Sequence, residues 1–385
     1  MNFDLTPGQR RWQELARDFA RRVLGPGADA WDEAGRYPLA AFREAAGLGL
    51  AGMFAPAVDG GQQLDGLTGS LVLEQLAQGC FATTFGLVVH NNFVRSLARG
   101  GTRAARARWL GALTRGELLG GFALTEPGAG TDAAAIGTTA TREPGGYRLD
   151  GVKAWVTNGS TADLYNVMAR TTPLAAGARS SADGISSIVV ERDRPGVSFG
   201  PPDRVTAARA LPTCEMRLDG VRVPADHLLG REGDGLRAAL ATIDLARAQV
   251  GAIATGLAQG ALDEAVGYAR ERRAFGRAIA EFQGLQFLLA DLAAQVEAAR
   301  WLAYRAAWLF DQGQPATRAC AIAKRVGVDA AEEVARKALE VFGASGLRRD
   351  RPVERYLRWA KVTAFIDGTP QVQQLVIARD LFRAR

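Results

Sequence analysis

The first residues of the chain follow the hydrophobic pattern of an amphipathic helix. Thr6 can cap this helix, Pro7 suits its first turn, and Gln9 stands at the spacing of a capping box. The Gly-Pro-Gly segment at 25–27 predicts the end of the helix. Between the two signals, apolar side chains recur on one face: Trp12, Leu15, Phe19 and Val23.

The same periodicity predicts further helices over about residues 38–47, 69–79, 82–99 and 102–114. We therefore expect an N-terminal helical domain over residues 1–118. Between 119 and 228 the pattern changes to short runs rich in β-branched and aromatic residues, such as YRLDGVKAWVT and ISSIVVE. Residues typical of turns separate these runs. This texture predicts a middle β domain, with the segment 172–184 as an exposed excursion.

From residue 233 onward the helical pattern returns. Apolar residues alternate spacings of four and three, which predicts a seam packed against neighbouring helices. The seam consists of Leu285, Leu289, Leu292, Val296, Ala299, Ala303, Ala306 and Phe310. The chain is thus predicted to have an α+β fold that ends in a C-terminal four-helix bundle over residues 229–385.

The composition narrows the class of protein. Of the 385 residues 48% are apolar, yet no uninterrupted apolar stretch reaches the roughly 18 residues of a membrane helix. The N-terminus also lacks the apolar core of a signal peptide. Because three cysteines, Cys80, Cys214 and Cys320, and two histidines are widely spaced, we expect neither disulfides nor a metal site. A cytoplasmic protein without membrane insertion is predicted.

The net charge of +6 raises the question of a nucleic-acid partner. Only four residues are lysines, and the arginines are scattered along solvated helix faces rather than clustered. This distribution favours an arginine-rich surface over a nucleic-acid site. Part of the charge could help to capture an anionic thioester carrier.

Four polar or glycine-containing motifs carry the chemistry. They are FALTEPGAGTD at 122–132, GVKAWVTNG at 151–159, ERRAFGR at 271–277 and FIDGTPQVQ at 365–373. In this order and spacing, over essentially the whole chain, they resemble the acyl-CoA dehydrogenase family of FAD-dependent enzymes. The resemblance implies a fold of an N-terminal helical domain, a β-barrel-like middle domain and a helical bundle. The GAG of the first motif is not a GxGxxG fingerprint, so a nicotinamide site of the Rossmann type is not predicted.

The first two motifs offer what a flavin needs, namely backbone amides, hydroxyls and small residues that allow close approach. Alternation along a strand would send Trp155 and Thr157 to the same side. By resemblance, Trp155 packs beside the flavin ring and Thr157 bonds its reactive nitrogen. The cofactor residues expected in these two motifs are Phe122, Leu124, Thr125, Gly130, Thr131, Trp155 and Thr157.

Further cofactor contacts are expected from a neighbouring subunit, which implies a homo-oligomer, usually a tetramer in this family. Arg272 matches the arginine that reaches the FAD pyrophosphate, for which a guanidinium fork is well suited. The remaining matches are Phe275, Gln283, Glu340, Gly343, Thr369 and Gln371. Three departures, Ala274, Glu340 and Pro370, could each remove a hydrogen bond worth about 1 kcal/mol.

Dehydrogenation of a thioester needs a carboxylate base beside the α carbon and a polarised carbonyl. The family places its base at one of two positions, and the one on a bundle helix carries Ala246 here, which leaves Asp367. The expected thioester contacts are Thr131, Asp244, Arg247 and Gly368. Alternatively, Arg247 only pairs with Asp244 across one helical turn. Glu126 is interpreted as a loop-capping carboxylate and His90 as a packed helix residue.

Asp367 is one methylene shorter than the glutamate common at its position, so several functions stay open. The first is a dehydrogenase for short, branched or cyclic acyl groups on CoA, with electron-transfer flavoprotein as the acceptor. The second is an oxidase or monooxygenase resembling nitroalkane oxidases, which also use aspartate. A dehydrogenase for thioesters of acyl carrier protein and a non-catalytic flavin-binding scaffold are further alternatives. Gln374, where family members commonly carry arginine, weakens the match to the first two.

Overall fold

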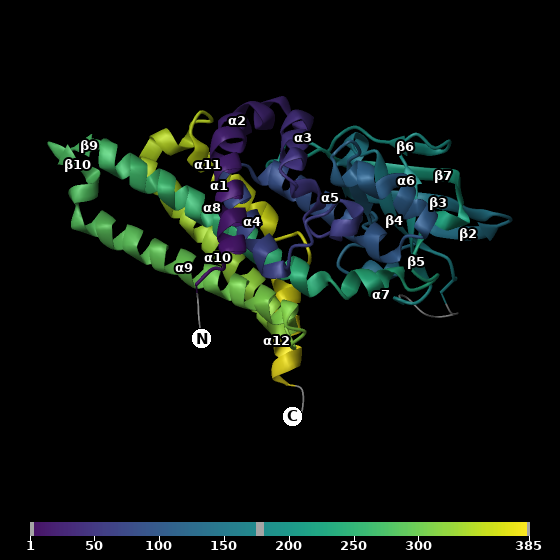
Figure 1. Ribbon diagram of the computed structural model, residues 1–385. Helices are drawn as coiled ribbons and strands as arrows, with labels where there is room; N and C mark the ends of the chain where they lie inside the picture. Colours follow the sequence, from purple (N-terminus) through teal and green to yellow (C-terminus); the bar gives the residue numbers. More distant parts are fainter. Residues whose placement is uncertain (1–3, 175–180, 383–385) are drawn as a thin grey trace.

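The computed structural model describes residues 4–174 and 181–382. Helices form the N-terminal part of the chain, strands form the middle part, and long helices form the C-terminal part (Figure 1). This arrangement confirms the predicted α+β fold. The segment 172–184, expected to be an exposed excursion, lies partly outside the described residues. In the described part of the chain, no helix is both long and apolar enough to cross a bilayer. The three cysteines are buried and free.

The first helix begins as predicted. Thr6 caps α1 (Pro7–Phe19), and the Thr6 hydroxyl and Gln9 side chain complete the capping box. Its predicted end at 25–27 is wrong, because the chain continues through the π-helical turn η1 (Ala20–Leu24) into α2 (Gly25–Ala34). Pro26 falls in the first turn of α2, where its missing N–H costs no hydrogen bond. The helix instead ends at Gly35, which has a φ of 61°.

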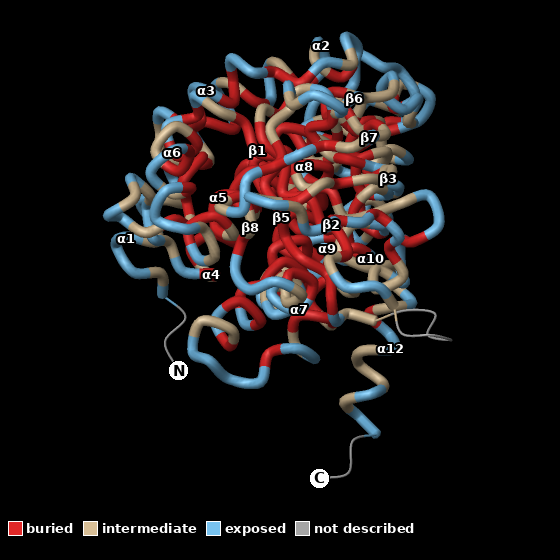
Figure 2. Tube along the Cα trace, turned by 90° about the vertical axis from the view of Figure 1, so that its right-hand side faces the viewer, coloured by how far each residue is buried: buried red, intermediate tan, exposed pale blue. Residues whose placement is uncertain are grey.

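The remaining N-terminal helices match the predicted segments closely. They are α3 (Leu39–Gly47), α4 (Gly66–Gly79), α5 (Phe81–Gly100) and α6 (Arg103–Thr114). The α4 and α5 helices are almost wholly buried, so they form the inner part of this layer (Figure 2). Short 3-10 turns at Leu50–Gly52 and Ala57–Asp59 connect α3 to α4.

The middle part is one eight-stranded sheet in the order β6-β7-β3-β1-β4-β5-β8, with β2 pairing to both β3 and β4. Because β1 also pairs with both β3 and β4, these four strands close on themselves, as expected of a barrel-like domain. The strands are β1 (Gly120–Ala123), β2 (Thr139–Glu143), β3 (Gly146–Thr157), β4 (Leu164–Arg170), β5 (Ile185–Glu191), β6 (Val197–Phe199), β7 (Thr213–Pro224) and β8 (Leu228–Leu229). The domain limits at 118 and 228 stay a prediction.

The C-terminal part is a helical bundle joined to the sheet by the short α7 (Gly235–Leu240). Its helices are α8 (Ile243–Glu271), α9 (Gln283–Asp311), α10 (Thr317–Phe342), α11 (Pro352–Thr363) and α12 (Pro370–Leu381). The hairpin β9 (Arg273–Ala274) and β10 (Arg277–Ala278) joins α8 to α9. The middle of the predicted seam is buried from Leu292 to Ala306, and its two ends are half-buried.

One buried carboxylate ties the three parts of the chain together. Asp32 of α2 is 2% exposed, and its Oδ2 lies 2.8 Å from Arg209 of the sheet domain and 3.0 Å from Arg358 of α11. Removal of one partner from such a buried ion pair leaves the other charges without compensation. Asp32 therefore fixes how the helical layer sits on the sheet and the bundle.

We expect Asp32→Asn to lower the free energy of unfolding by about 1–3 kcal/mol, because two arginines would lose their common acceptor. Urea denaturation followed by circular dichroism measures this change. The neighbouring Glu33 also contacts Arg209, at 3.3 Å, but it is largely exposed, so Glu33→Gln is the matched control with little expected effect. Equal stability of the two variants would contradict a bridging role for Asp32.

Candidate functional site

The first two motifs lie side by side in the sheet. Phe122 of β1 pairs with Thr157 of β3, and the amide of Ala154 donates to the carbonyl of Thr125 at 2.8 Å. The loop that follows β1 therefore runs beside the segment of β3 that carries Trp155. This arrangement brings the start of the loop, up to Thr125, beside Trp155 and Thr157, and Gly130 and Thr131 follow later on the same loop.

A buried ion pair between Lys153 and Glu126 supports the loop that follows β1. Glu126 accepts hydrogen bonds from the amides of Gly137 (2.7 Å) and Thr138 (2.9 Å) and from Lys153 (2.7 Å), which confirms it as a loop-capping carboxylate. Burial alone would raise the pKa of Glu126, but Lys153 and the two amides hold that pKa below its usual value. Burial in turn lowers the pKa of Lys153 to about 8, although Glu126 counteracts this effect. The loop thus rests on one lysine that also donates to the carbonyl of Leu124.

The strand geometry at Trp155 differs from the prediction. The β3–β7 register shifts between Lys153 and Val156, and Trp155 has a φ of 55°, so simple alternation does not describe this stretch. The bulge turns the Trp155 side chain outward, where it is 62% exposed. Non-glycine residues with such a φ are uncommon and concentrate at functional sites.

The residues of this region fit a flavin. Trp155 offers an exposed aromatic face, and space is open beside Gly128 and Gly130, where an added Cβ would meet no atom within 4 Å. The hydroxyls of Thr125 and Thr157 have no hydrogen-bond partner in the described part of the chain. The site therefore combines a planar surface, free donors and room for a ligand, as a flavin requires.

The third motif lies far from the first two. Arg272, Phe275 and Gln283 lie at or beside the β9–β10 hairpin, at the end of the bundle opposite the sheet (Figure 1). Phe275 is 96% exposed and has a φ of 52°. A single chain therefore does not bring these residues to Trp155, which agrees with their expected role toward another subunit.

The remaining predicted cofactor residues lie at helix ends of the bundle. Gly343 follows α10 with a φ of 58°, and Glu340 forms ion pairs with Arg336 (2.5 Å) and Lys337 (3.0 Å). Thr369 caps α12 by accepting from Val372, and Gln371 is exposed in the first turn. Pro370 suits this first turn, so the departure from the family pattern is favourable for the helix.

Asp367 lies in a turn that Lys324 holds from α10. The Lys324 ammonium is buried and donates to the carbonyls of Ile366 and Gly368, on either side of Asp367. Gln373 donates to the Gly368 carbonyl at 3.1 Å. Asp367 has a φ of 50° and Gly368 a φ of 96°, so two consecutive residues are left-handed. The turn is strained, and buried side chains fix it.

The electrostatics at Asp367 favour a carboxylate that can take up a proton. Burial raises the pKa of Asp367, while Lys324 and Arg247 act in the opposite direction. Burial lowers the pKa of Lys324 to about 8, although Asp367 counteracts this effect. The amide N–H of Asp367 has no acceptor among the described residues, so it is free to bind a ligand oxygen.

The predicted thioester contacts are only partly assembled. Arg247 is 9% exposed and donates to Asp244 at 3.1 Å, so the pairing across one helical turn is present. Its Nε, however, has no partner among the described residues, and its charge acts on the pKa of Asp367, so the pairing with Asp244 does not use all of its donors. Thr131 is exposed on the loop after β1.

His90 is a packed helix residue, as expected. Its Nδ1 accepts from the amide of Gly120 at 2.9 Å and its Nε2 faces the carbonyl of Leu113 at 3.2 Å, which requires the neutral ring. Burial lowers the pKa of His90 to about 4. The sequence motifs did not include Lys324 and Gln373. For Lys324 the available signal was a lysine that directly follows the apolar stretch CAIA at 320–323.

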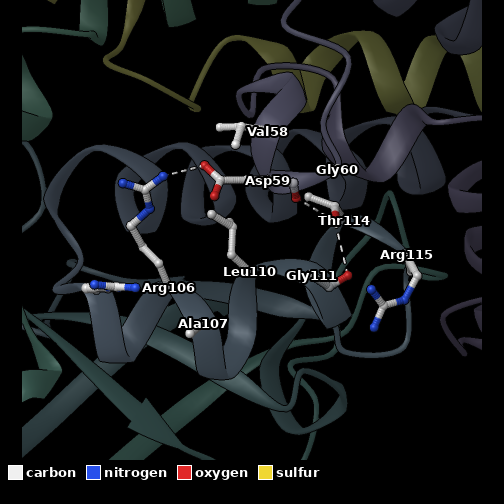
Figure 3. A pocket seen from close by; sticks show the side chains of 10 residues that line it. Val58, Asp59, Gly60, Arg106, Ala107, Leu110, Gly111, Thr114 and Arg115 are labelled. Atoms are coloured by element: carbon white, nitrogen blue, oxygen red, sulfur yellow. Dashed lines mark hydrogen bonds and ion pairs between the residues drawn. The ribbon is translucent and has the colours of Figure 1, made fainter.

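One cleft of about 690 Å³ lies elsewhere, between the segment 58–60 and α6 (Figure 3). Asp59 and Arg106 form an ion pair of 2.6 Å across its edge. Its lining includes none of the predicted site residues. The cleft therefore does not define the candidate site.

Comparisons with known proteins agree with this geometry. Models of the acyl-CoA dehydrogenase N-terminal, middle and C-terminal domains match residues 6–117, 121–221 and 233–382. The chain is 36% identical to the probable acyl-CoA dehydrogenase YngJ of Bacillus subtilis over the full length of both chains. It resembles the solved butyryl-CoA dehydrogenase of Megasphaera elsdenii with a TM-score of 0.94, 36% identity and full coverage of both chains. The prolyl acyl carrier protein oxidase AnaB gives a TM-score of 0.90 at 30% identity and covers 98% of this chain and 100% of its own.

We expect Lys324→Met to loosen the turn around Asp367, because the carbonyls of Ile366 and Gly368 would lose their common donor. Amide hydrogen exchange over residues 364–369 should accelerate by about 5- to 100-fold, the range for lost buried hydrogen bonds. Lys337→Met, on the surface of the same helix, is the control. Unchanged exchange in the Lys324 variant would show that other contacts hold the turn.

Proposed function

Because the chain belongs to the acyl-CoA dehydrogenase family, we propose that it oxidises the α,β bond of an acyl-CoA thioester, with Asp367 as the base. As a member, it is an FAD-dependent oxidoreductase that acts on CH–CH bonds, so the predicted enzyme class and cofactor are confirmed. The identity of the base, the acyl group and the electron acceptor belong to the proposal.

The turn around Asp367 carries this proposal. A raised pKa makes the carboxylate a stronger base than an exposed aspartate, and its position is fixed by Lys324. The free N–H of Asp367 is available to donate to the thioester carbonyl, which would stabilise negative charge as the α proton leaves. Asp367 would accept that proton. When bound, the flavin supplies the acceptor for the hydride from the β carbon.

The cofactor residues would come from two chains. Thr125, Trp155 and Thr157 would hold the flavin ring in one subunit, and Arg272 would reach the pyrophosphate from another. The separation of these groups within one chain supports a homo-oligomer (Figure 1). A tetramer is typical of the family, and the assembly of this chain is part of the proposal.

A second candidate is an oxidase or dehydrogenase that acts on an acyl carrier protein thioester. The similarity to AnaB over nearly the whole chain favours this alternative. In the first case electron-transfer flavoprotein would reoxidise the flavin, and in an oxidase oxygen would do so. Anaerobic titration with acyl-CoAs separates the two, because only a CoA-dependent enzyme would bleach its flavin with free CoA esters.

Replacement of Asp367 by Asn should lower turnover by about 10²–10⁴-fold, the usual contribution of a general base. The variant keeps the size of the side chain, so the visible flavin spectrum and the FAD content should stay unchanged. Turnover is measured by flavin bleaching with short and branched acyl-CoAs. Asp380 on α12, a half-buried aspartate that pairs with Arg318 at 2.9 Å, provides the control Asp380→Asn. Full activity of the Asp367 variant would exclude this residue as the base.

The pH dependence should follow the same carboxylate. Because only the ionised form of Asp367 can accept a proton, kcat/KM should fall as the pH decreases through a pKa above the ordinary aspartate value of 3.8. In Lys324→Met the loss of a nearby cation should move this acidic limb to higher pH. Rate profiles of both proteins test the shift. An acidic limb at the same pH in both would contradict the assigned pair.

A further inference from the structure

Among the residues that the structure describes, Arg95 of α5 is a buried cation without a counter-ion. It is 7% exposed, and its Nη2 donates a hydrogen bond to Asn92 Oδ1 at 3.1 Å. Its guanidinium carbon lies 5.3 Å from the centroid of the Phe54 ring. Burial lowers the pKa of Arg95 to about 10, and the neighbouring Arg99 adds to this effect. An anion bound here would offset the cost of the buried charge.

The other deeply buried arginines in the described chain have a carboxylate or several carbonyls as acceptors, although the Nε atoms of Arg247 and Arg355 have no partner. Arg247 pairs with Asp244 at 3.1 Å and Arg355 with Asp29 at 2.8 Å. Arg170 has no carboxylate but donates to four backbone carbonyls. The contacts of the Arg95 guanidinium are the amide oxygen of Asn92 and the ring of Phe54. Its guanidinium fork is therefore available to a ligand.

A second polar side chain without partners lies close by. Gln249 of α8 is 1% exposed, and neither its Oε1 nor its Nε2 has a hydrogen-bond partner among the described residues. A Cβ added at Gly69 of α4 would come within 2.5 Å of the Phe54 ring and 3.5 Å of Gln249 Nε2. Phe54 therefore adjoins both Gln249 and Arg95. The buried amide and the buried cation flank one aromatic ring.

This cluster is held rigidly against α5. Asn91 accepts from the amide of Met53 at 2.9 Å and donates to the carbonyl of Leu50 at 2.8 Å. The segment that carries Phe54 is thereby fixed to the helix that carries Arg95. The unmet hydrogen bonds are thus features of a fixed site rather than of a mobile surface.

The cluster also adjoins the candidate active site along α8. Arg247, whose charge reaches Asp367, precedes Gln249 by two residues and points to the other side of α8, but Ala246, where the family can carry its base, lies one turn before Gln249 on the same face. Gly251 packs on α10 beside Lys324, since an added Cβ would lie 3.3 Å from the Lys324 backbone nitrogen. One stretch of α8 therefore passes the Asp367 turn and reaches the cluster. A short acyl chain could span the two.

We propose that Arg95, Gln249 and Phe54 form a subsite for a carboxylate at the far end of the acyl chain. A guanidinium fork matches the two oxygens of a carboxylate, and the Gln249 amide can add a third hydrogen bond. The Phe54 ring would pack against the methylenes between the carboxylate and the reacting carbons. This inference rests on the proposed function, and it makes the substrate a short dicarboxylic acyl thioester.

Glutaryl-CoA and pentanoyl-CoA test the subsite, because they share a five-carbon chain and differ in the terminal carboxylate. In anaerobic flavin bleaching, kcat/KM of the native protein should be about 10- to 100-fold higher for glutaryl-CoA, the range of a charge-assisted hydrogen bond. In Arg95→Met that advantage should disappear, while pentanoyl-CoA keeps its rate within about twofold. Arg99→Met, an exposed arginine one turn later on α5, should behave like the native protein.

Two outcomes would overturn the subsite. One is a preference of the native protein for pentanoyl-CoA, which needs no variant to observe. The other is an equal loss with both esters in Arg95→Met, which would place a phosphate of CoA at the arginine. If Arg95→Met fails to fold, Gln249→Leu and the native comparison decide the question.

A failure of the proposed function would look different. In that case neither ester would bleach the flavin of the native protein. Equilibrium binding of the same two esters, measured by calorimetry, then tests the subsite alone. Tighter binding of glutaryl-CoA that depends on Arg95 would uphold it, and equal binding would overturn it.

Discussion

The ammonium of Lys324 is the contact on which the geometry of the candidate site depends. It joins α10 to the two carbonyls that flank Asp367, and no regular helix or strand holds that turn. The left-handed backbone of Asp367 is unfavourable for a free chain, so the turn persists because the bundle supports it. The α10 helix that carries Lys324 also packs closely on α8, where a Cβ added at Gly327 would lie 2.8 Å from the Gly251 carbonyl oxygen and one added at Gly251 would lie 3.3 Å from the Lys324 backbone nitrogen. A side chain at either glycine would push the helices apart.

Much of the fold follows from local rules. The cap at Thr6, the helix periodicity of the first layer, the short strands and the bundle seam each predicted the observed element, because each rests on neighbouring residues. The end of the first helix was mispredicted for the same reason. A Gly-Pro pair stops an isolated helix, but the π-helical turn before it rearranged the hydrogen bonds so that the chain could continue.

Less of the candidate site than of the fold could be predicted from the sequence. The motifs located Asp367 and Trp155, but their left-handed backbones result from long-range contacts. Lys324 lies more than forty residues from the turn that it holds, and nothing in its neighbourhood marks its partners. Similarly, the sequence does not reveal that Arg95 lacks a carboxylate, because the answer depends on every side chain around it. Local patterns predict elements, and pairing between elements has to be observed.

The use of lysine in this chain follows from the same physics. Among 47 basic residues four are lysines, and two of these, Lys153 and Lys324, are buried beneath the two functional loops. Each donates to backbone carbonyls and adjoins one carboxylate, Glu126 or Asp367. A compact ammonium can meet acceptors in several directions within a tight turn, whereas a planar guanidinium needs a wider, flat arrangement. Burial also brings the pKa of both lysines down to about 8, so each loop rests on a cation that is held by its acceptors rather than by water. The arginines, in contrast, form mostly exposed ion pairs, and Arg95 stands out because it shares the burial of the lysines without sharing their partners.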